Sequence, residues 1–498
     1  MKKFLLLTLF ILLFFIALFP RSVEVLNHNP IFGFDQGRDY LAVRSIVVDG
    51  KFTLIGAEIG AGSAGINGIF QGPFHYYFLA IPFIIFRGDP YGGLLLMFLL
   101  SIATVFFSLY FGKKMFGFFG GLMMALLVAV SPPLISQARF IWNSHQSSLF
   151  VLLSFYFTYY IREKKYKNIF LAAFFAGFIY NFEIAIAIPM CVAIFIYSVL
   201  IFRFKQLKQY FFMILGFVLA FLPMIMFEAR HGFIGFRGLL NYILAPNRNS
   251  FPLDMGKQLM DHFNSFKYNF LGTFPGSPIP LWMLALIIIL PAIYFLITEK
   301  NKLLKSFIFY LFILLVSSFF VFSFLKNAVW QFYLIELNFA YIVFFVYVIY
   351  SLFQRKAYYF LPIPLILSVI FLWQGTISAY KISKYDYSDY GGTEKMSGKL
   401  DAIDYIYKDA EGRSFGVFFF APPIYTYPYD YLLVWYGKEK YSYLPYHEKK
   451  GTFYLLIEPD SARLWYKGWL ETVIKTGQII ETKTLPSGFI IQKRFGEI

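Results

Sequence analysis

Apolar segments long enough to cross a lipid bilayer recur along most of this chain, and short clusters of Lys and Arg stand between them. A helix of about 20 apolar residues crosses the roughly 30 Å of bilayer hydrocarbon. Of the 498 residues, 59% are hydrophobic and 14% are charged, whereas soluble domains are about 25% charged. The sequence therefore predicts a mainly α-helical, polytopic membrane protein.

The basic clusters orient these segments. Cytoplasmic loops are enriched in Lys and Arg, so we place every cluster in the cytoplasm and require an even number of crossings between successive clusters. The clusters are residues 2–3, 113–114, 162–167, 203–208, 300–305 and 355–356. Because basic residues stand in these short runs between apolar segments, the net charge of +16 does not indicate nucleic acid as a partner.

The parity condition predicts about eleven transmembrane helices. The run 74–86 is short, contains His75 and Pro82, and is followed by Arg87, so we interpret it as an interfacial or re-entrant helix. The run 168–202 must cross twice, as a hairpin that turns at 180–183. The predicted spans are residues 4–19, 91–111, 117–134, 147–161, the two arms of 168–202, 210–227, 281–297, 307–324, 332–350 and 357–373.

The same topology divides the chain into two domains. Residues 1–20 resemble a signal peptide but lack a small-x-small cleavage site, so we interpret them as an uncleaved first span with a cytoplasmic N-terminus. A transmembrane catalytic domain is predicted over 1–377, with an outer loop and interfacial helices at 21–89. Over 378–498, short apolar strand patterns alternate with helical patterns, which predicts a small extracytoplasmic α/β domain for acceptor handling or packing.

Asp35 and Asp39 are the first charged residues that need an explanation. They stand four residues apart, so both carboxylates share one face of a predicted short surface helix. Asp35 is interpreted as a functional residue, with Arg38 and Asp39 as neighbours; the alternative is that Asp35 caps the helix. Arg44 and Asp49 are expected only to solvate that helix.

Further polar candidates lie at the predicted outer ends of the spans. Arg139 and Lys326 are the basic residues of the short outer loops, against the topological bias, which suggests a bound anion; a snorkelling arginine is the alternative. Glu336 is expected within the bilayer, facing a cavity or a partner. The candidate residues for binding an anion or a sugar are Arg38, Asp39, His75, Arg139, Trp142, Asn143, Arg230, His231, Lys326 and Glu336.

Four motifs, in this order, resemble the GT-C membrane glycosyltransferases. They are "FDQGRDYLAVRSIVVDG", "QGPFHYYFLAIPFIIFRGDP", "SPPLISQARFIWN" and "WQFYLIELNFAYIVFF". The branch resembled is the family 39-like one, with protein O-mannosyltransferases, aminoarabinose transferases acting on lipid A and Rgt-type lipopolysaccharide glycosyltransferases. The resemblance covers roughly the first 375 residues.

The resemblance implies Asp35 as the catalytic base, a polyprenyl-phosphate-linked sugar donor, and transfer with inversion to a hydroxyl of a lipid, glycan or protein. The family often has Asp-Glu where this chain has Asp35-Gln36, and aspartate where it has Asn143, so Asn143 is not expected to be catalytic. The leaving phosphate needs cationic partners, for which Arg139, Arg230 and Lys326 are candidates.

Two other functions stay open beside this one. A transporter or flippase of lipid-linked sugars would tend to show paired repeats and broken midplane helices, and the sequence shows no internal repeat. A glycan ligase differs mainly in the size of its donor. No cofactor is implied, and a divalent metal is left open, since Asp35, Asp39, Asp49 and Glu58 have no metal-ligand spacing.

Overall fold

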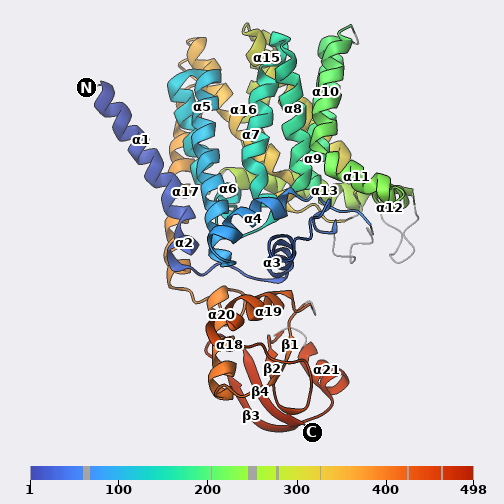
Figure 1. Cartoon of the computed structure of the whole chain (residues 1–498). Coiled ribbons are helices and arrows are strands. Elements are labelled where there is room, and N and C mark those ends of the chain that lie inside the picture. Colours follow the sequence, from blue (N-terminus) through green and yellow to red (C-terminus); the bar gives the residue numbers. More distant parts are fainter. Residues whose placement is uncertain are drawn as a thin grey trace.

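The computed structural model describes residues 2–59, 68–203, 205–244, 255–275, 280–325, 327–422, 425–460 and 464–496. Figure 1 shows a bundle of helices at one end of the molecule and a small domain with a β-sheet at the other. Between them lie two short helices, α3 (Phe34–Val47) and α4 (Phe74–Ile85).

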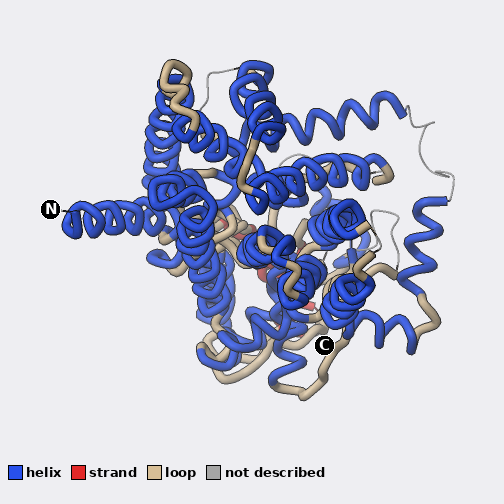
Figure 2. The backbone as a smooth tube through the Cα atoms, turned by 90° about the horizontal axis from the view of Figure 1, so that it is seen from above, coloured by secondary structure: helices blue, strands red, loops and turns tan. Residues whose placement is uncertain are grey.

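Most predicted spans coincide with a helix or with one arm of a helix, whereas the predicted span 210–227 is divided between two helices that are bent by 68° at their junction. The bundle comprises α1 (Lys2–Leu18), α5 (Pro90–Val130), α7 (Ser147–Tyr159), α8 (Tyr166–Phe178), α9 (Ile184–Phe202), α10 (Leu207–Ala220), α11 (Leu222–Arg230), α14 (Leu281–Thr298), α15 (Lys302–Ser323), α16 (Ile335–Gln354) and α17 (Pro362–Ser388). The predicted hairpin of 168–202 is formed by α8 and α9, which meet at Ile179–Asn181. Figure 2, a view along the bundle, shows α1 leaning away from the other helices.

Helix α5 is a hairpin of two arms. Gly117 interrupts its 41 residues with φ 77°, a conformation that glycine adopts without steric cost. The arms then touch, because a Cβ at Gly121 would lie 2.5 Å from the backbone N of Lys113. The turn falls at the basic pair 113–114, where the sequence places a cytoplasmic connection between two spans.

Length and composition alone identify fewer spans among the described residues. Six helices are at least 18 residues long and apolar enough to cross a membrane, and α10 with α11, bent by 68° at their junction, would make a seventh. The six are α5, α9, α14, α15, α16 and α17. The architecture is that of a multi-pass membrane protein, and eleven crossings stays a prediction.

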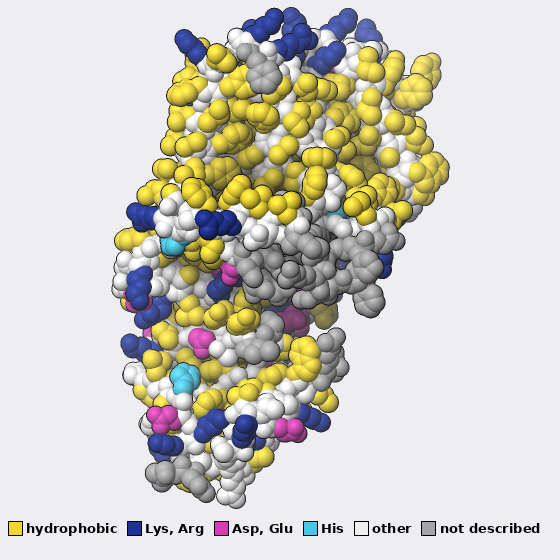
Figure 3. Space-filling model, turned by 90° about the vertical axis from the view of Figure 1, so that its right-hand side faces the viewer, with side chains coloured by type: hydrophobic (Ala, Val, Ile, Leu, Met, Phe, Trp, Pro, Cys, Tyr) yellow, Lys and Arg dark blue, Asp and Glu magenta, His cyan; other side chains and the backbone are white. Residues whose placement is uncertain are grey.

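Shorter helices cover the bundle end that faces the small domain. They are α2 (Val23–Asn27), α6 (Pro132–Ser136), α12 (Ile234–Leu244) and α13 (Met255–Thr273), together with α3 and α4. The predicted interfacial helix is α4, with Pro82 inside its 12 residues. Figure 3 shows an apolar belt on the bundle, with Lys and Arg side chains gathered at the end remote from the small domain.

The C-terminal domain is a four-stranded sheet with helices, as the strand patterns predicted. Its strands are β1 (Gly416–Phe420), β2 (Gly451–Ile457), β3 (Gln478–Thr484) and β4 (Ile490–Gly496), in the order β1-β2-β4-β3. Strand β1 runs parallel to β2, and the other pairs are antiparallel. The helices are α18 (Met396–Ala410), α19 (Tyr427–Leu432), α20 (Lys438–Tyr441) and α21 (Trp465–Trp469). Strand β3 was not predicted, because its side chains are all exposed.

One hydrophobic core joins this domain to the bundle. Tyr40 of α3, Leu79 of α4 and Leu94 of α5 belong to the same buried cluster as Tyr431 and Leu432 of α19. Helix α3 approaches α19 so closely that a Cβ at Gly37 would lie 2.3 Å from the backbone N of Pro428. The helix that bears Asp35 is therefore held between the bundle and the C-terminal domain.

Candidate functional site

Helix α3 begins at a cap that does not use Asp35. Gly33 is the N-cap residue, and its backbone N–H donates to Oε1 of Gln36 (2.9 Å). Nε2 of Gln36 donates to the carbonyl O of Ile141 (2.6 Å), which ties the start of α3 to the segment after α6. Asp35 lies in the first turn, where the helix dipole favours a carboxylate. The side chain of Asp35 is therefore not used to cap the helix.

Asp35 is the exposed end of a chain of charged side chains. Arg38 donates from Nη1 to Oδ1 of Asp35 (2.9 Å), and from Nε and Nη2 to Oδ1 of Asp39 (both 2.8 Å). Oδ2 of Asp39 lies 3.0 Å from Nε2 of His75 on α4. The side chain of Asp35 is 35% exposed, whereas that of Asp39 is 2% exposed. The predicted neighbours Arg38 and Asp39 do meet Asp35, and His75 joins them from a second helix.

The two carboxylates have opposite pKa shifts. Burial raises the pKa of Asp35 above its usual value, and the guanidinium of Arg38 only partly offsets this. Burial also opposes ionisation of Asp39, but Arg38 and His75 outweigh it and hold the pKa of Asp39 below its usual value. Asp39 is therefore a fixed anion that positions Arg38, whereas Asp35 is the stronger base.

Arg139 is already paired with two carboxylates. Nε donates to Oε2 of Glu24 (2.9 Å), and Nη2 donates to Oε1 of Glu24 and Oδ2 of Asp386 (both 2.5 Å). These partners lie on α2 and at the end of α17, 115 and 247 residues from Arg139 in the chain, so Arg139 joins two distant segments. The contacts differ from both sequence interpretations, an anion-binding residue and a snorkelling arginine.

Trp142, Asn143 and His145 follow α6 and make packing contacts. The ring of Trp142 lies 4.3 Å from that of Phe332, which precedes α16. Nδ2 of the buried Asn143 donates to Oε1 of Gln71 (2.9 Å) and to the carbonyl O of Phe182 (2.5 Å). The third of the four motifs thus contacts the second through Gln71 and the fourth through Phe332.

The structure describes two other predicted residues near the end of α11. Arg230 is exposed, and His231 stacks on Phe227 at 4.1 Å. Phe227 also contacts Phe70. This end of α11 therefore lies beside the last residues of a glycine-rich loop, residues 50–72. Lys326 and the loop centre, residues 60–67, lie outside the described residues.

Glu336 is fully buried in the first turn of α16, and Oε1 accepts a hydrogen bond from Ser318 of α15 (3.1 Å). We expected Glu336 to face a cavity or a partner; Ser318 contacts it, and its role in donor binding stays a prediction. Its Oε2 has no partner among the described residues.

The sequence did not single out two aromatic residues of the C-terminal domain that contact Phe34, the residue before Asp35. Tyr425 and Tyr427 contact Phe34 with ring centroids 5.1 and 5.3 Å apart, and Arg38 lies over the ring of Phe34. A Tyr-rich segment, "PPIYTYPYDY", was the available signal. In the described parts of the chain, no three His, Cys, Asp or Glu side chains gather as metal ligands would.

Two solved structures share this arrangement over nearly their whole length. The crystal structure of ArnT from Cupriavidus metallidurans bound to undecaprenyl phosphate matches with a TM-score of 0.58 and 10% identity, covering 99% of this chain and 98% of ArnT. The apo structure of the same protein matches with a TM-score of 0.55 and 11% identity, covering 99% and 97%. The chain has the fold of ArnT.

This fold agrees with the one expected from the resemblance that the four motifs carry. The likeness in fold covers 99% of the chain and so includes the C-terminal α/β domain. No protein-family model matches the sequence, and no curated protein matches it. The likeness to ArnT is therefore one of fold, and the polytopic architecture with a small C-terminal sheet domain is confirmed.

Proposed function

We propose that this protein is an inverting membrane glycosyltransferase that moves a sugar from a polyprenyl-phosphate-linked donor to a hydroxyl acceptor. The observation that supports it best is Asp35, a partly exposed carboxylate with a raised pKa beside a positioned guanidinium. The ArnT fold adds to this, since one of the matching structures holds undecaprenyl phosphate.

In the proposed reaction, the acceptor oxygen attacks the anomeric carbon as Asp35 takes its proton. The new bond joins the acceptor oxygen to that carbon, and the bond from the carbon to the phosphate oxygen breaks. The products are a glycoside and polyprenyl phosphate, and the proton resides on Asp35. A base of raised pKa suits this step because it holds a proton more readily near neutral pH.

Inversion follows from the use of one carboxylate. A double displacement with retention needs a second carboxylate as nucleophile. Asp39 is the nearest candidate in sequence, but its oxygens face Arg38 and His75 and its side chain is 2% exposed. A single displacement, assisted by Asp35 alone, agrees better with this geometry.

The leaving phosphate is proposed to meet cations from the surrounding loops. Arg230 is exposed on α11, and Lys326 stands in the connection before α16. The charge of Arg139 is matched by Glu24 and Asp386, so we assign it to joining α2 and α17. The proposed acceptor side is the C-terminal domain, whose Tyr425 and Tyr427 lie against Phe34.

We place the reaction on the extracytoplasmic face. The Lys and Arg side chains gather at the bundle end remote from the C-terminal domain, and such residues favour the cytoplasm. The N-terminus would then be cytoplasmic, and α3, α4 and the C-terminal domain would lie outside.

The test is transfer of a labelled sugar from an undecaprenyl-phosphate-linked donor, followed by mass analysis of glycoside and released lipid phosphate. The Asp35→Asn variant should lose at least about a hundredfold in rate, as expected for removal of a general base. The matched control is Asp49→Asn, an exposed carboxylate just beyond α3 that pairs with Arg44. Equal rates for Asp35→Asn and the unmodified protein would refute this role of Asp35.

The same preparation distinguishes the proposed transferase from the other two functions, a transporter and a glycan ligase. Sealed liposomes that accumulate lipid-linked sugar without a covalent product would indicate a transporter. Transfer of a whole preassembled glycan, seen as the product mass, would indicate a ligase.

A further inference from the structure

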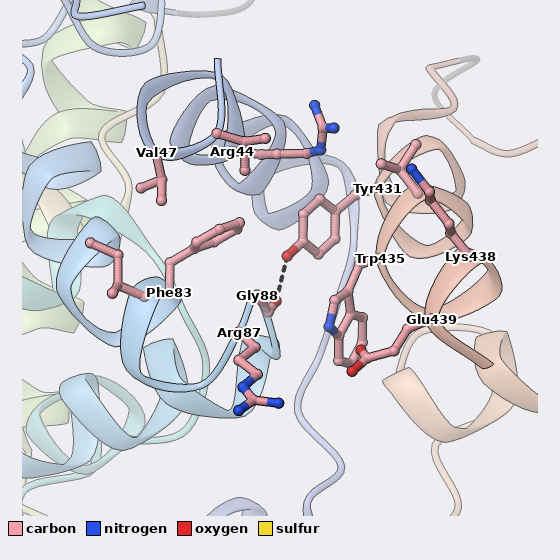
Figure 4. Close-up of a pocket in the computed structure, with 12 residues that line it drawn as sticks. Arg44, Val47, Phe83, Arg87, Gly88, Tyr431, Trp435, Lys438 and Glu439 are labelled. Carbon is pink, nitrogen blue, oxygen red and sulfur yellow. Dashed lines mark hydrogen bonds between the residues drawn. The ribbon is translucent and has the colours of Figure 1, made fainter. Parts of the chain in front are cut away.

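A cavity of about 580 Å³ lies between the bundle and the C-terminal domain, away from Asp35. Its walls come from the end of α3, the turn between α4 and α5, and the region of α19 and α20 (Figure 4). Arg44, which lines it, follows Asp35 by about two and a half helical turns and so lies on the opposite face of α3. The cavity is therefore separate from the proposed transfer site.

Positive charge predominates in the cavity wall. Arg44, Arg87 and Lys438 line it together with one carboxylate, Glu439. Asp49 stands outside the lining, with its Oδ1 3.6 Å from Nη1 of Arg44. The three cations come from three different elements that line one cavity, and Figure 4 shows the guanidinium groups of Arg44 and Arg87 on opposite sides of it. That arrangement suits an anion, and guanidinium groups suit phosphate in particular.

The inner wall is aromatic and tightly packed. The hydroxyl of Tyr431 donates to the carbonyl O of Gly88 in the α4–α5 turn. Gly88 has φ 90°, and a Cβ there would lie 3.0 Å from Cδ1 of Trp435. The indole N–H of Trp435 has no acceptor among the described residues. Trp and Tyr are characteristic of the membrane–water interface, which fits the position of this wall beside α4.

An apolar strip leads to the cavity along α4. Ile84, which lines the cavity, is 63% exposed, and its neighbours Ile81 and Ile85 are 58% and 68% exposed. Val48, another lining residue, is 59% exposed. These side chains lie on an interfacial helix, where lipid chains would cover them.

We propose that this cavity binds the phosphate headgroup of an anionic membrane phospholipid, whose acyl chains cover the isoleucines of α4. A free phosphate would use the cations but leave the apolar strip uncovered. A zwitterionic lipid would cover the strip but bring a second cation into a positively charged cavity. The lipid would join α3, α4 and the C-terminal domain at their common edge, independently of sugar transfer.

The test is native mass spectrometry of the full chain in detergent, titrated with phosphatidylglycerol or with phosphatidylcholine of the same acyl chains. We expect saturable binding of phosphatidylglycerol that is at least about tenfold tighter than that of phosphatidylcholine. The Arg44→Gln/Arg87→Gln/Lys438→Gln variant should lose at least about tenfold in affinity. The charge-preserving Arg44→Lys/Arg87→Lys/Lys438→Arg variant should keep most of it, and tests the site even where the first variant folds poorly.

The matched control is Lys450→Gln/Lys467→Gln/Lys475→Gln, which removes equal charge from exposed positions of the same domain outside the cavity lining. Equal loss in this control, or equal binding of the two lipids, would overturn the proposal. Inorganic phosphate that displaces phosphatidylglycerol at equal concentration would overturn the lipid assignment. Asp35→Asn should bind the lipid with unchanged affinity. The lipid-binding result can therefore be interpreted even if the proposed transfer reaction is refuted.

Discussion

Oδ2 of Asp39 lies 3.0 Å from Nε2 of His75, and this contact joins α3 to α4 beneath the proposed base. The other oxygen of Asp39 accepts two hydrogen bonds from Arg38, whose Nη1 reaches Asp35. We therefore propose that Asp39 is a positioning residue: its oxygens face Arg38 and His75, and it orients the guanidinium that meets Asp35. The ion pairs that Arg38 makes with Asp35 and Asp39 have distinct consequences for the pH dependence of the proposed sugar transfer.

Replacing Asp39 with Asn should make Asp35 more acidic. The negative charge of Asp39 raises the pKa of Asp35, so its removal lowers that pKa and shifts the acidic limb of the pH–rate profile to lower pH. Loss of the charged acceptor should also lower the free energy of unfolding by about 2 kcal/mol. A pH–rate profile and a thermal melt check both effects. A fall in stability with an unmoved profile would mean that Asp39 acts only in folding.

Replacing Arg38 with Gln should have the opposite effect on the profile. The guanidinium lowers the pKa of Asp35, so its removal raises that pKa and moves the acidic limb to higher pH. The rate on the plateau should also fall, since Asp35 loses its orienting partner. Lys51→Gln, which removes an exposed cation from the loop after α3, should leave the profile unchanged. A shift to lower pH in Arg38→Gln would contradict the described ion pairs.

Gly37→Ala should loosen the contact between α3 and the C-terminal domain. The added Cβ would lie 2.3 Å from the backbone N of Pro428 and 2.4 Å from the backbone C of Tyr427, so the two helices must separate. Overpacking of this kind costs about 1–3 kcal/mol, which a thermal melt would detect. Gly272→Ala is the control, because this helical glycine has open space around it and alanine there should stabilise α13 slightly. Equal melting temperatures of Gly37→Ala and the unmodified protein would mean that α3 and α19 are not in the close contact described.

Arg139→Gln should reduce stability and leave the KM for the donor unchanged. Burial lowers the pKa of Arg139, but Glu24 and Asp386 outweigh it and hold the guanidinium charged. Without Arg139, the buried Glu24 loses its cation, at a cost of about 3 kcal/mol. Thermal melts and donor titrations separate the two roles, and Arg139→Lys should recover part of the stability. An increased KM with unchanged stability would instead support the phosphate-binding role.

Much of the membrane part could be predicted because its signals are local. A run of apolar residues forms a helix in lipid whatever its neighbours are, since its backbone must satisfy its own hydrogen bonds. This is why most predicted spans coincide with helices, and why the hairpin of 168–202 turns close to its predicted position. The order of the motifs likewise sufficed to predict the ArnT-like fold.

Residue roles depended on contacts between distant parts of the chain. Asp35 and Asp39 look alike in the sequence, yet the packing of α4 and His75 against α3 buries Asp39 and leaves Asp35 partly exposed. Arg139 seemed free to bind an anion until α17 brought Asp386 to it.

The sequence by itself determined the polytopic helical class, most of the helices and three of the four strands, and it singled out Asp35 as a candidate. Burial, ion pairing and the cavity between the domains were decided by tertiary structure alone. The physical reason is that a charge acquires its pKa and its partners from groups that meet only when the chain has folded.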